Sequence, residues 1–160
     1  MPYVILNSDS TPAASEDRKV GPLLGPRRLL RAIRGQEIDH PLALWASDLV
    51  GVHEKRARAV PDEVFGIDTH RAYIVRAIDV WIERCVPQHR DGASLHTETF
   101  GSVIDRIAAA HVSAVHALTT LDISRDPQVH LAWRRLAELV AGYGDLAAEV
   151  VLGRRRLPAP

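Results

Sequence analysis

One stretch of the chain decides where one of its long apolar helices begins: His96-Thr97-Glu98-Thr99-Phe100-Gly101-Ser102-Val103-Ile104-Asp105-Arg106. Thr97 is a favoured N-cap residue, and Glu98 in the turn that follows complements the positive end of the helix dipole. An apolar face with helical spacing comes next. Its members are Phe100, Val103, Ile104, Ile107, Ala114, Val115 and Leu118. The spacing predicts one continuous helix from Thr97 to about Thr119.

Four other helices are predicted from the same kinds of signal, which are proline or an N-cap at the start, apolar residues every three or four positions, and glycine or proline at the end. Their expected ranges are Pro26 to about Arg34, His40-Pro41 to before Pro61, about Ile67 to Val86, and Asp126-Pro127 to Gly153. No segment shows the strict alternation of a strand. We therefore expect an all-α fold, an antiparallel bundle of four long helices plus a short N-terminal helix.

The chain of 160 residues is long enough for one domain with a real core. Residues 1–20 lack an apolar period and are expected to form a flexible N-terminal segment. Residues 21–153 would form the single helical-bundle domain. Residues 154–160 would form a basic C-terminal tail, which we interpret as a solvated helix end, because its Arg154-Arg155-Arg156 run compensates the helix dipole.

Composition excludes several classes of protein. The 20 basic and 20 acidic side chains cancel, so the uniform positive field of a nucleic-acid binder is missing. No apolar run reaches the roughly 20 residues of a membrane span. A single cysteine, Cys85, excludes an intrachain disulfide and fits a reducing cytoplasm, so we expect a cytoplasmic protein; its spacing places it in the core. No motif indicates a cofactor.

Helical rotation of about 100° per residue places several polar side chains within the apolar stripes. These are His53 and Arg56 of the second helix, His70 of the third and His111 of the fourth. If the three imidazoles met inside the bundle, they would form an acid-base or metal site. Otherwise each ring finds its own partner. A metal is not indicated, because no two of these histidines have the spacing that chelates from one helix.

The fourth helix has a second face that carries Glu98 and Asp105, with Arg106 nearby and small residues between them. Two carboxylates seven residues apart lie about 10.5 Å from each other along a helix axis. This separation suits a polyhydroxylated or cationic ligand better than a shared proton. In the structural alternative, Asp105 pairs with an arginine on a neighbouring helix.

The quoted stretch resembles the central motif of the bacterial domain of unknown function 4254 family, in which His-Thr-Glu-Thr-x-Gly is followed by Ile-Asp-Arg. The flanks resemble its actinobacterial members, from His40-Pro41-Leu42 to the closing Leu157-Pro158. Phe100 departs from the pattern, because the family more often has a smaller residue there. The resemblance implies an all-helical protein whose positions to test are Glu98, Asp105 and Arg106. Other branches of the family lie beside sugar-transfer genes, which points to envelope glycans and, for an enzyme, to glycan or small-molecule metabolism.

These observations favour a binding or accessory module that recognises a partner protein or a small polar ligand. Its ligand-binding residues would be Glu98, Asp105, Arg106 and Arg56. The alternative is an enzyme in which His53, His70 and His111 serve as acid-base groups or metal ligands. A third interpretation is a homodimer whose groove is filled by its own copy.

Overall fold

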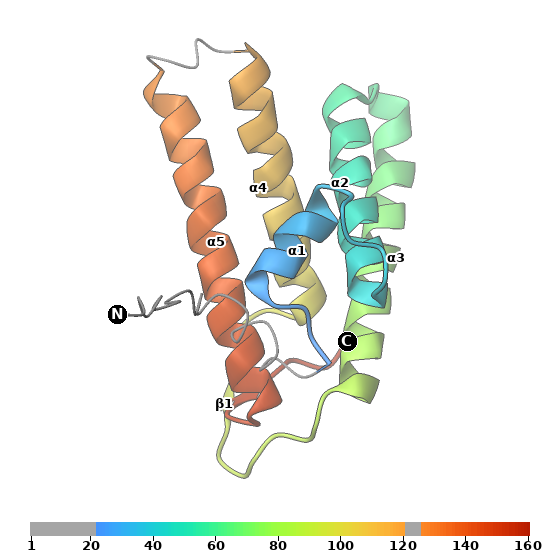
Figure 1. Ribbon diagram of the computed structural model, residues 1–160. Helices are drawn as coiled ribbons and strands as arrows, with labels where there is room; N and C mark the ends of the chain where they lie inside the picture. Colours follow the sequence, from blue (N-terminus) through green and yellow to red (C-terminus); the bar gives the residue numbers. More distant parts are fainter. Residues whose placement is uncertain (1–21, 121–125) are drawn as a thin grey trace, which may run out of the picture.

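The chain folds as an all-α protein, as the sequence predicts. A computed structural model describes residues 22–120 and 126–160; the predicted N-terminal segment 1–20 lies outside the described residues. The helices are α1 (Pro26–Ile33), α2 (Pro41–Arg58), α3 (Pro61–Cys85), α4 (Phe100–Thr120) and α5 (Pro127–Val151). Two short strands, β1 (Ser94–Leu95) and β2 (Arg155–Arg156), complete the fold (Figure 1). None of the described helices is both long and apolar enough to pass through a bilayer.

Several helix ends lie where the local sequence predicts them. The Nδ1 atom of His40 accepts a hydrogen bond from the backbone N–H of Leu42 at 3.2 Å, which caps α2. Asp126 caps α5 in the same way, through the N–H of Gln128 at 2.8 Å. Gly35 follows α1 with a φ of 70°, a left-handed conformation that glycine adopts without strain.

Two predicted helix starts are wrong. Helix α3 begins at Pro61 rather than Ile67, because Pro61 occupies the first helical position and Glu63 accepts from the N–H of Val60 at 3.3 Å. Helix α4 begins at Phe100, and its cap is Thr99 rather than Thr97: Thr99 Oγ1 accepts from the N–H of Ser102 at 3.2 Å. Glu98 therefore precedes the helix instead of lying in its first turn.

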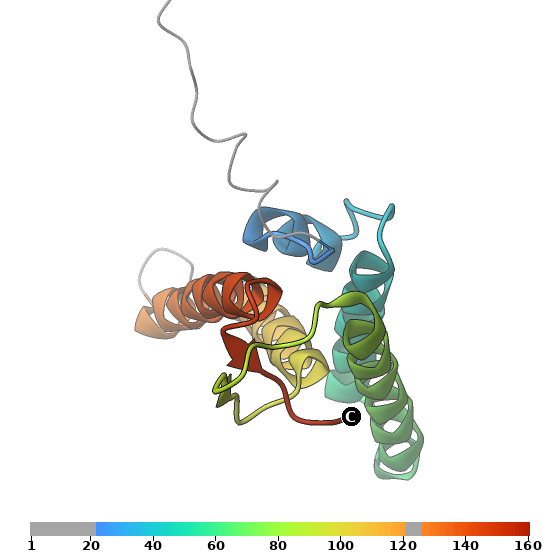
Figure 2. The ribbon, with the colours of Figure 1, turned by 90° about the horizontal axis from the view of Figure 1, so that it is seen from below.

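Helix α4 is the central element, because it packs against α2, α3 and α5 (Figures 1 and 2). Its fully buried face includes Phe100, Ile104 and Ile107. The Phe100 ring lies 5.4 Å from that of Tyr143 on α5. The Tyr143 hydroxyl donates to the carbonyl oxygen of Leu24 at 2.8 Å, and burial raises its pKa, so the donor proton is retained. These contacts join α4, α5 and the segment before α1.

The first turn of α4 rests directly on α3. The backbone N–H of Gly101 donates to Asp79 Oδ1 at 2.6 Å, and Asp79 is only 8% exposed. A Cβ atom at position 101 would overlap the carbonyl oxygen of Val75 and lie 2.9 Å from Asp79 Oδ1. Burial raises the pKa of Asp79, against the opposing effect of the Gly101 hydrogen bond. Glycine at 101 is therefore required by the close approach of the two helices.

The C-terminal tail is not simply solvated, contrary to the prediction. Strand β2 pairs in parallel with β1, so that Ser94 lies opposite Arg155. Arg155 Nε also donates to Glu149 at 2.7 Å. The loop after α3 therefore contains a short strand that the sequence did not indicate. Cys85, expected in the core, is exposed at the end of α3.

We predict that Gly101→Ala destabilises the protein by about 1–3 kcal/mol, because the added methyl group forces α4 away from α3. Gly66→Ala is the control. A Cβ atom added at position 66 would meet nothing within 4 Å, and the position is exposed in α3, so alanine there should stabilise by about 0.5–1 kcal/mol. Urea denaturation measures both. Equal effects of the two substitutions would show that the α3–α4 contact tolerates a side chain.

Comparison with Asp79→Asn should show how the free energy of unfolding depends on the ionisation of the buried Asp79 carboxyl group. The folded state binds the Asp79 proton more tightly than the unfolded chain, whose pKa is near 3.8. Its contribution to stability is therefore fully present below that pH and is lost as the pH rises through the raised pKa. Asparagine does not titrate and retains an oxygen that accepts from Gly101. We expect the free energy of unfolding of the unsubstituted protein, minus that of Asp79→Asn, to decrease between about pH 3 and about pH 7. If this difference increased with pH instead, the pKa of Asp79 would be lowered in the folded state, contrary to the prediction.

Candidate functional site

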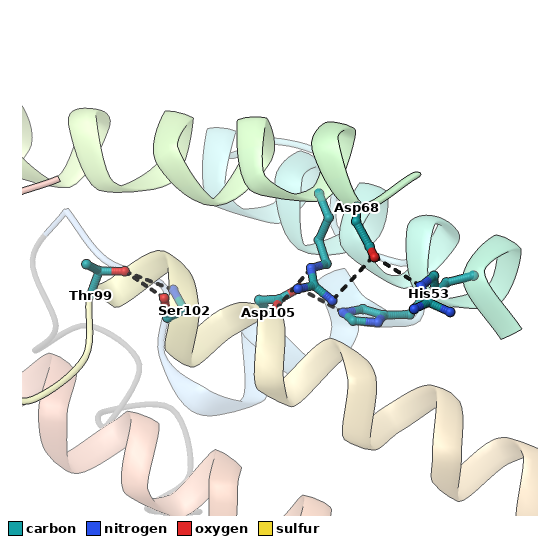
Figure 3. A network of polar contacts seen from close by, with 7 residues as sticks. His53, Asp68, Thr99, Ser102 and Asp105 are labelled. Atoms are coloured by element: carbon teal, nitrogen blue, oxygen red, sulfur yellow. Dashed lines mark hydrogen bonds and ion pairs between the residues drawn. The ribbon is translucent and has the colours of Figure 1, made fainter. Parts of the chain in front are cut away.

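Asp105 forms a partly buried contact between α4 and α2. Its Oδ1 atom accepts a hydrogen bond from His53 Nε2 at 2.8 Å, and the two side chains are 19% and 13% exposed (Figure 3). Arg71 of α3 approaches the other carboxylate oxygen, with Nε 3.8 Å from Oδ2. Because a carboxylate only accepts, Nε2 of His53 carries the proton and Nδ1 is the remaining basic atom when the ring is neutral.

The contact continues outward as a chain of alternating charges. Arg71 Nη1 lies 3.8 Å from Asp68 Oδ1, and Arg56 Nε donates to the same oxygen at 3.1 Å. Arg56 and Asp105, both predicted as ligand-binding residues, thus belong to one network without touching each other. The pairing of Asp105 with Arg71 agrees with the structural alternative for Asp105. We call His53, Asp105, Arg71, Asp68 and Arg56 the charge network.

Glu98 and Arg106 lie elsewhere and form an ion pair with each other. With His96, Thr97 and Glu138 they line a cavity of about 300 Å³ between the start of α4 and helix α5. Its remaining walls are Val103, Leu139, Gly142, Tyr143 and Leu146. We call it the motif cavity. His96 is held beside Glu98, because its Nδ1 atom lies 2.9 Å from the carbonyl oxygen and 3.2 Å from the backbone nitrogen of Glu98.

The predicted common face of Glu98, Asp105 and Arg106 is therefore wrong. Glu98 precedes α4, so helical spacing does not relate it to Asp105. Asp105 and Arg106 are adjacent in the helix, and their side chains leave it about 100° apart. One points into the charge network and the other toward the motif cavity.

The three candidate histidines do not form a common centre. His70 is exposed, so its predicted inward orientation is wrong. His111 lines a different cavity together with Glu54, Arg58 and His116. Its buried Nδ1 atom has no hydrogen-bond partner among residues 22–120 and 126–160, and burial lowers its pKa. Within the same ranges, no three His, Cys, Asp or Glu side chains are grouped to hold a metal ion.

Sequence reasoning missed Asp79, Asp68 and Arg71 as members of polar contacts. A signal existed for Asp79, because it is an acid directly beside Ile78 and one turn before Ile82 on a buried stripe. Charged residues within such stripes are rarely buried without a partner. Asp68 and Arg71 offered only the i,i+3 spacing of an ordinary surface ion pair, and their other partners, Arg56 and Asp105, lie on other helices.

We predict that Asp105→Ala lowers the free energy of unfolding by about 1–3 kcal/mol, because His53 and Arg71 lose their acceptor in a partly buried place. Asp48→Ala is the control, since Asp48 is exposed on α2 and should change stability by at most about 0.5 kcal/mol. Chemical denaturation of both variants measures the difference. A loss no larger than that of the control would remove the structural role assigned to Asp105.

The comparisons with known proteins identify a family but no activity. The sequence model of the family described as Protein of unknown function (DUF4254) matches residues 50–159, which is more than half of the chain and includes the whole quoted motif. No curated protein and no solved structure matches the chain. All residues of the charge network and of the motif cavity lie within the matched range. The chain belongs to the DUF4254 family.

Proposed function

We propose that the protein is a binding module that recognises a small polar ligand in the motif cavity. The observation that carries this proposal is the convergence of His96, Thr97, Glu98, Arg106 and Glu138 on one cavity of about 300 Å³. A concave space of this size is at the lower end of those that hold small molecules. It favours a small ligand over a partner protein, because protein interfaces are larger and flatter.

The charges of the motif cavity favour a ligand with cationic or hydrogen-bond-donating groups. Glu98 already pairs with Arg106. Glu138 is exposed and has no ion pair within the described part of the chain, so its carboxylate is available to a ligand. An ammonium or hydroxyl group of a ligand could donate to it. The apolar side chains of Leu139 and Leu146 would contact its carbon skeleton.

A second candidate function is acid-base catalysis by His53, supported by the 2.8 Å contact of its Nε2 atom with Asp105. A carboxylate that holds an imidazole through one nitrogen orients the other nitrogen for proton transfer. This candidate needs a substrate atom within hydrogen-bond reach of His53 Nδ1. It predicts that His53→Gln abolishes any turnover while Glu138→Gln leaves it unchanged.

The binding proposal is tested by thermal shift with four probes: glucosamine, spermidine, glucose 6-phosphate and ATP. We expect the two amine probes to raise the melting temperature of the unsubstituted protein, since a ligand that binds only the folded state must stabilise it. Glu138→Gln should weaken their binding by on the order of tenfold, because it removes a charge-assisted hydrogen bond.

Asp145→Asn is the matched control, because Asp145 is exposed on the same helix and does not line the motif cavity. It should leave the shifts unchanged. Stabilisation by the anionic probes alone, or amine shifts that persist undiminished in Glu138→Gln, would refute the proposed site.

A further inference from the structure

A further cavity, of about 410 Å³, is lined by Phe100 and by the C-terminal segment. Its walls come from the end of α3, the start of α4, the end of α5 and the chain after α5. Figure 2 shows the C-terminal segment leaving α5 and crossing the end of the bundle toward α3. We call this space the tail cavity. It shares no lining residue with the motif cavity.

Charges of opposite sign line the tail cavity, and they come from different elements. Asp79 and Glu83 lie one helical turn apart on α3, and Arg156 lies on β2. Asp79 already accepts from Gly101 and is nine-tenths buried. Neither Glu83 nor Arg156 makes a side-chain hydrogen bond or ion pair with any residue in 22–120 or 126–160. One anion and one cation thus remain available across the same cavity.

The floor between these charges is apolar. It consists of Ile82, Val86, Phe100, Val150 and Leu157. Removing such surface from water favours binding of a hydrocarbon group by about 25 cal/mol per Å². The cavity therefore offers three separate features to a ligand, which are an anion, a cation and an apolar surface.

We propose that the tail cavity binds a small zwitterion with an aliphatic body, such as a free apolar amino acid. The ammonium group would contact Glu83 beside Asp79, the carboxylate would contact Arg156, and the aliphatic part would cover the apolar floor. A ligand with a single charge would leave one of the two protein charges partly desolvated and unpaired, which is unfavourable. A zwitterion compensates both.

The Arg156 side of the cavity is held in place before any ligand binds. The N–H of His96 donates to the carbonyl oxygen of Arg156 at 2.7 Å, and β1 pairs with β2 next to it. Arg90 N donates to the carbonyl oxygen of Gly153 at 2.9 Å, which fixes the start of the segment. Such preorganisation reduces the entropy lost on binding.

Three probes of similar shape separate the contributions: L-leucine, 4-methylpentanoate, which lacks the ammonium group, and 3-methylbutylamine, which lacks the carboxylate. Dissociation constants are measured by calorimetry and amide chemical shifts on the full chain at neutral pH. We expect L-leucine to bind on the order of tenfold more tightly than either analogue, as an additional charge-assisted contact allows. The shifted amides should belong to residues that line the tail cavity.

Two variants test which protein side chain contacts each charged group of the ligand. Glu83→Gln should weaken L-leucine and 3-methylbutylamine by on the order of tenfold and leave 4-methylpentanoate unchanged. Arg156→Gln should weaken L-leucine and 4-methylpentanoate and leave 3-methylbutylamine unchanged. Arg154→Gln is the control, because Arg154 is exposed and does not line the cavity. Glu138→Gln should also have no effect, which separates this test from that of the motif cavity.

Three results would overturn the proposal. They are no binding of L-leucine at millimolar concentration, equal affinity for all three probes, and equal weakening of all probes by both variants. Circular dichroism of each variant shows whether the helical fold is retained. The two positions are exposed, so a loss of fold is not expected.

Discussion

The structure depends on the contact of Gly101 with the buried carboxyl group of Asp79. This hydrogen bond satisfies an N–H group at the start of α4, where the helix itself offers no acceptor. It also brings α4 so close to α3 that the backbone oxygen of Val75 occupies the space of a side chain. This contact sets how closely α4 approaches α3. Helix α4 contributes residues to the motif cavity, the tail cavity and the charge network.

The central position of α4 explains why a contiguous motif serves several surfaces. A helix that packs on three neighbours directs successive side chains to different partners. Asp105 therefore meets His53 and Arg71, whereas Arg106 meets Glu98 beside α5. Phe100 lines the tail cavity, and Tyr143, whose ring it contacts, lines the motif cavity. Some residues of the His96-to-Arg106 motif therefore pack α4 against its neighbours, and others line a cavity.

The histidines show how the surroundings decide the role of an imidazole. His53 has a carboxylate acceptor and only a small exposed fraction, which suits a fixed orientation. His70 faces solvent because, within the described part of the chain, α3 packs mainly against α2 and α4 and leaves much of its surface uncovered. The buried Nδ1 atom of His111 lacks a protein partner in the described ranges, and desolvation favours its neutral form. Sequence spacing alone treats the three as equivalent.

Local signals in the chain were enough to specify the helical class and those helix ends that rest on neighbouring residues, such as His40 before Pro41 and Asp126 before Pro127. Capping and proline geometry act within a few residues, so they can be read locally. Tertiary packing decided where the first turn of α4 meets α3, through Gly101 and Asp79, and it placed Asp105 and Arg106 on different sites. Those outcomes depend on the rotation and distance of one helix relative to another. These are set by long-range contacts, such as that of Gly101 with α3, which periodicity within a single helix does not contain.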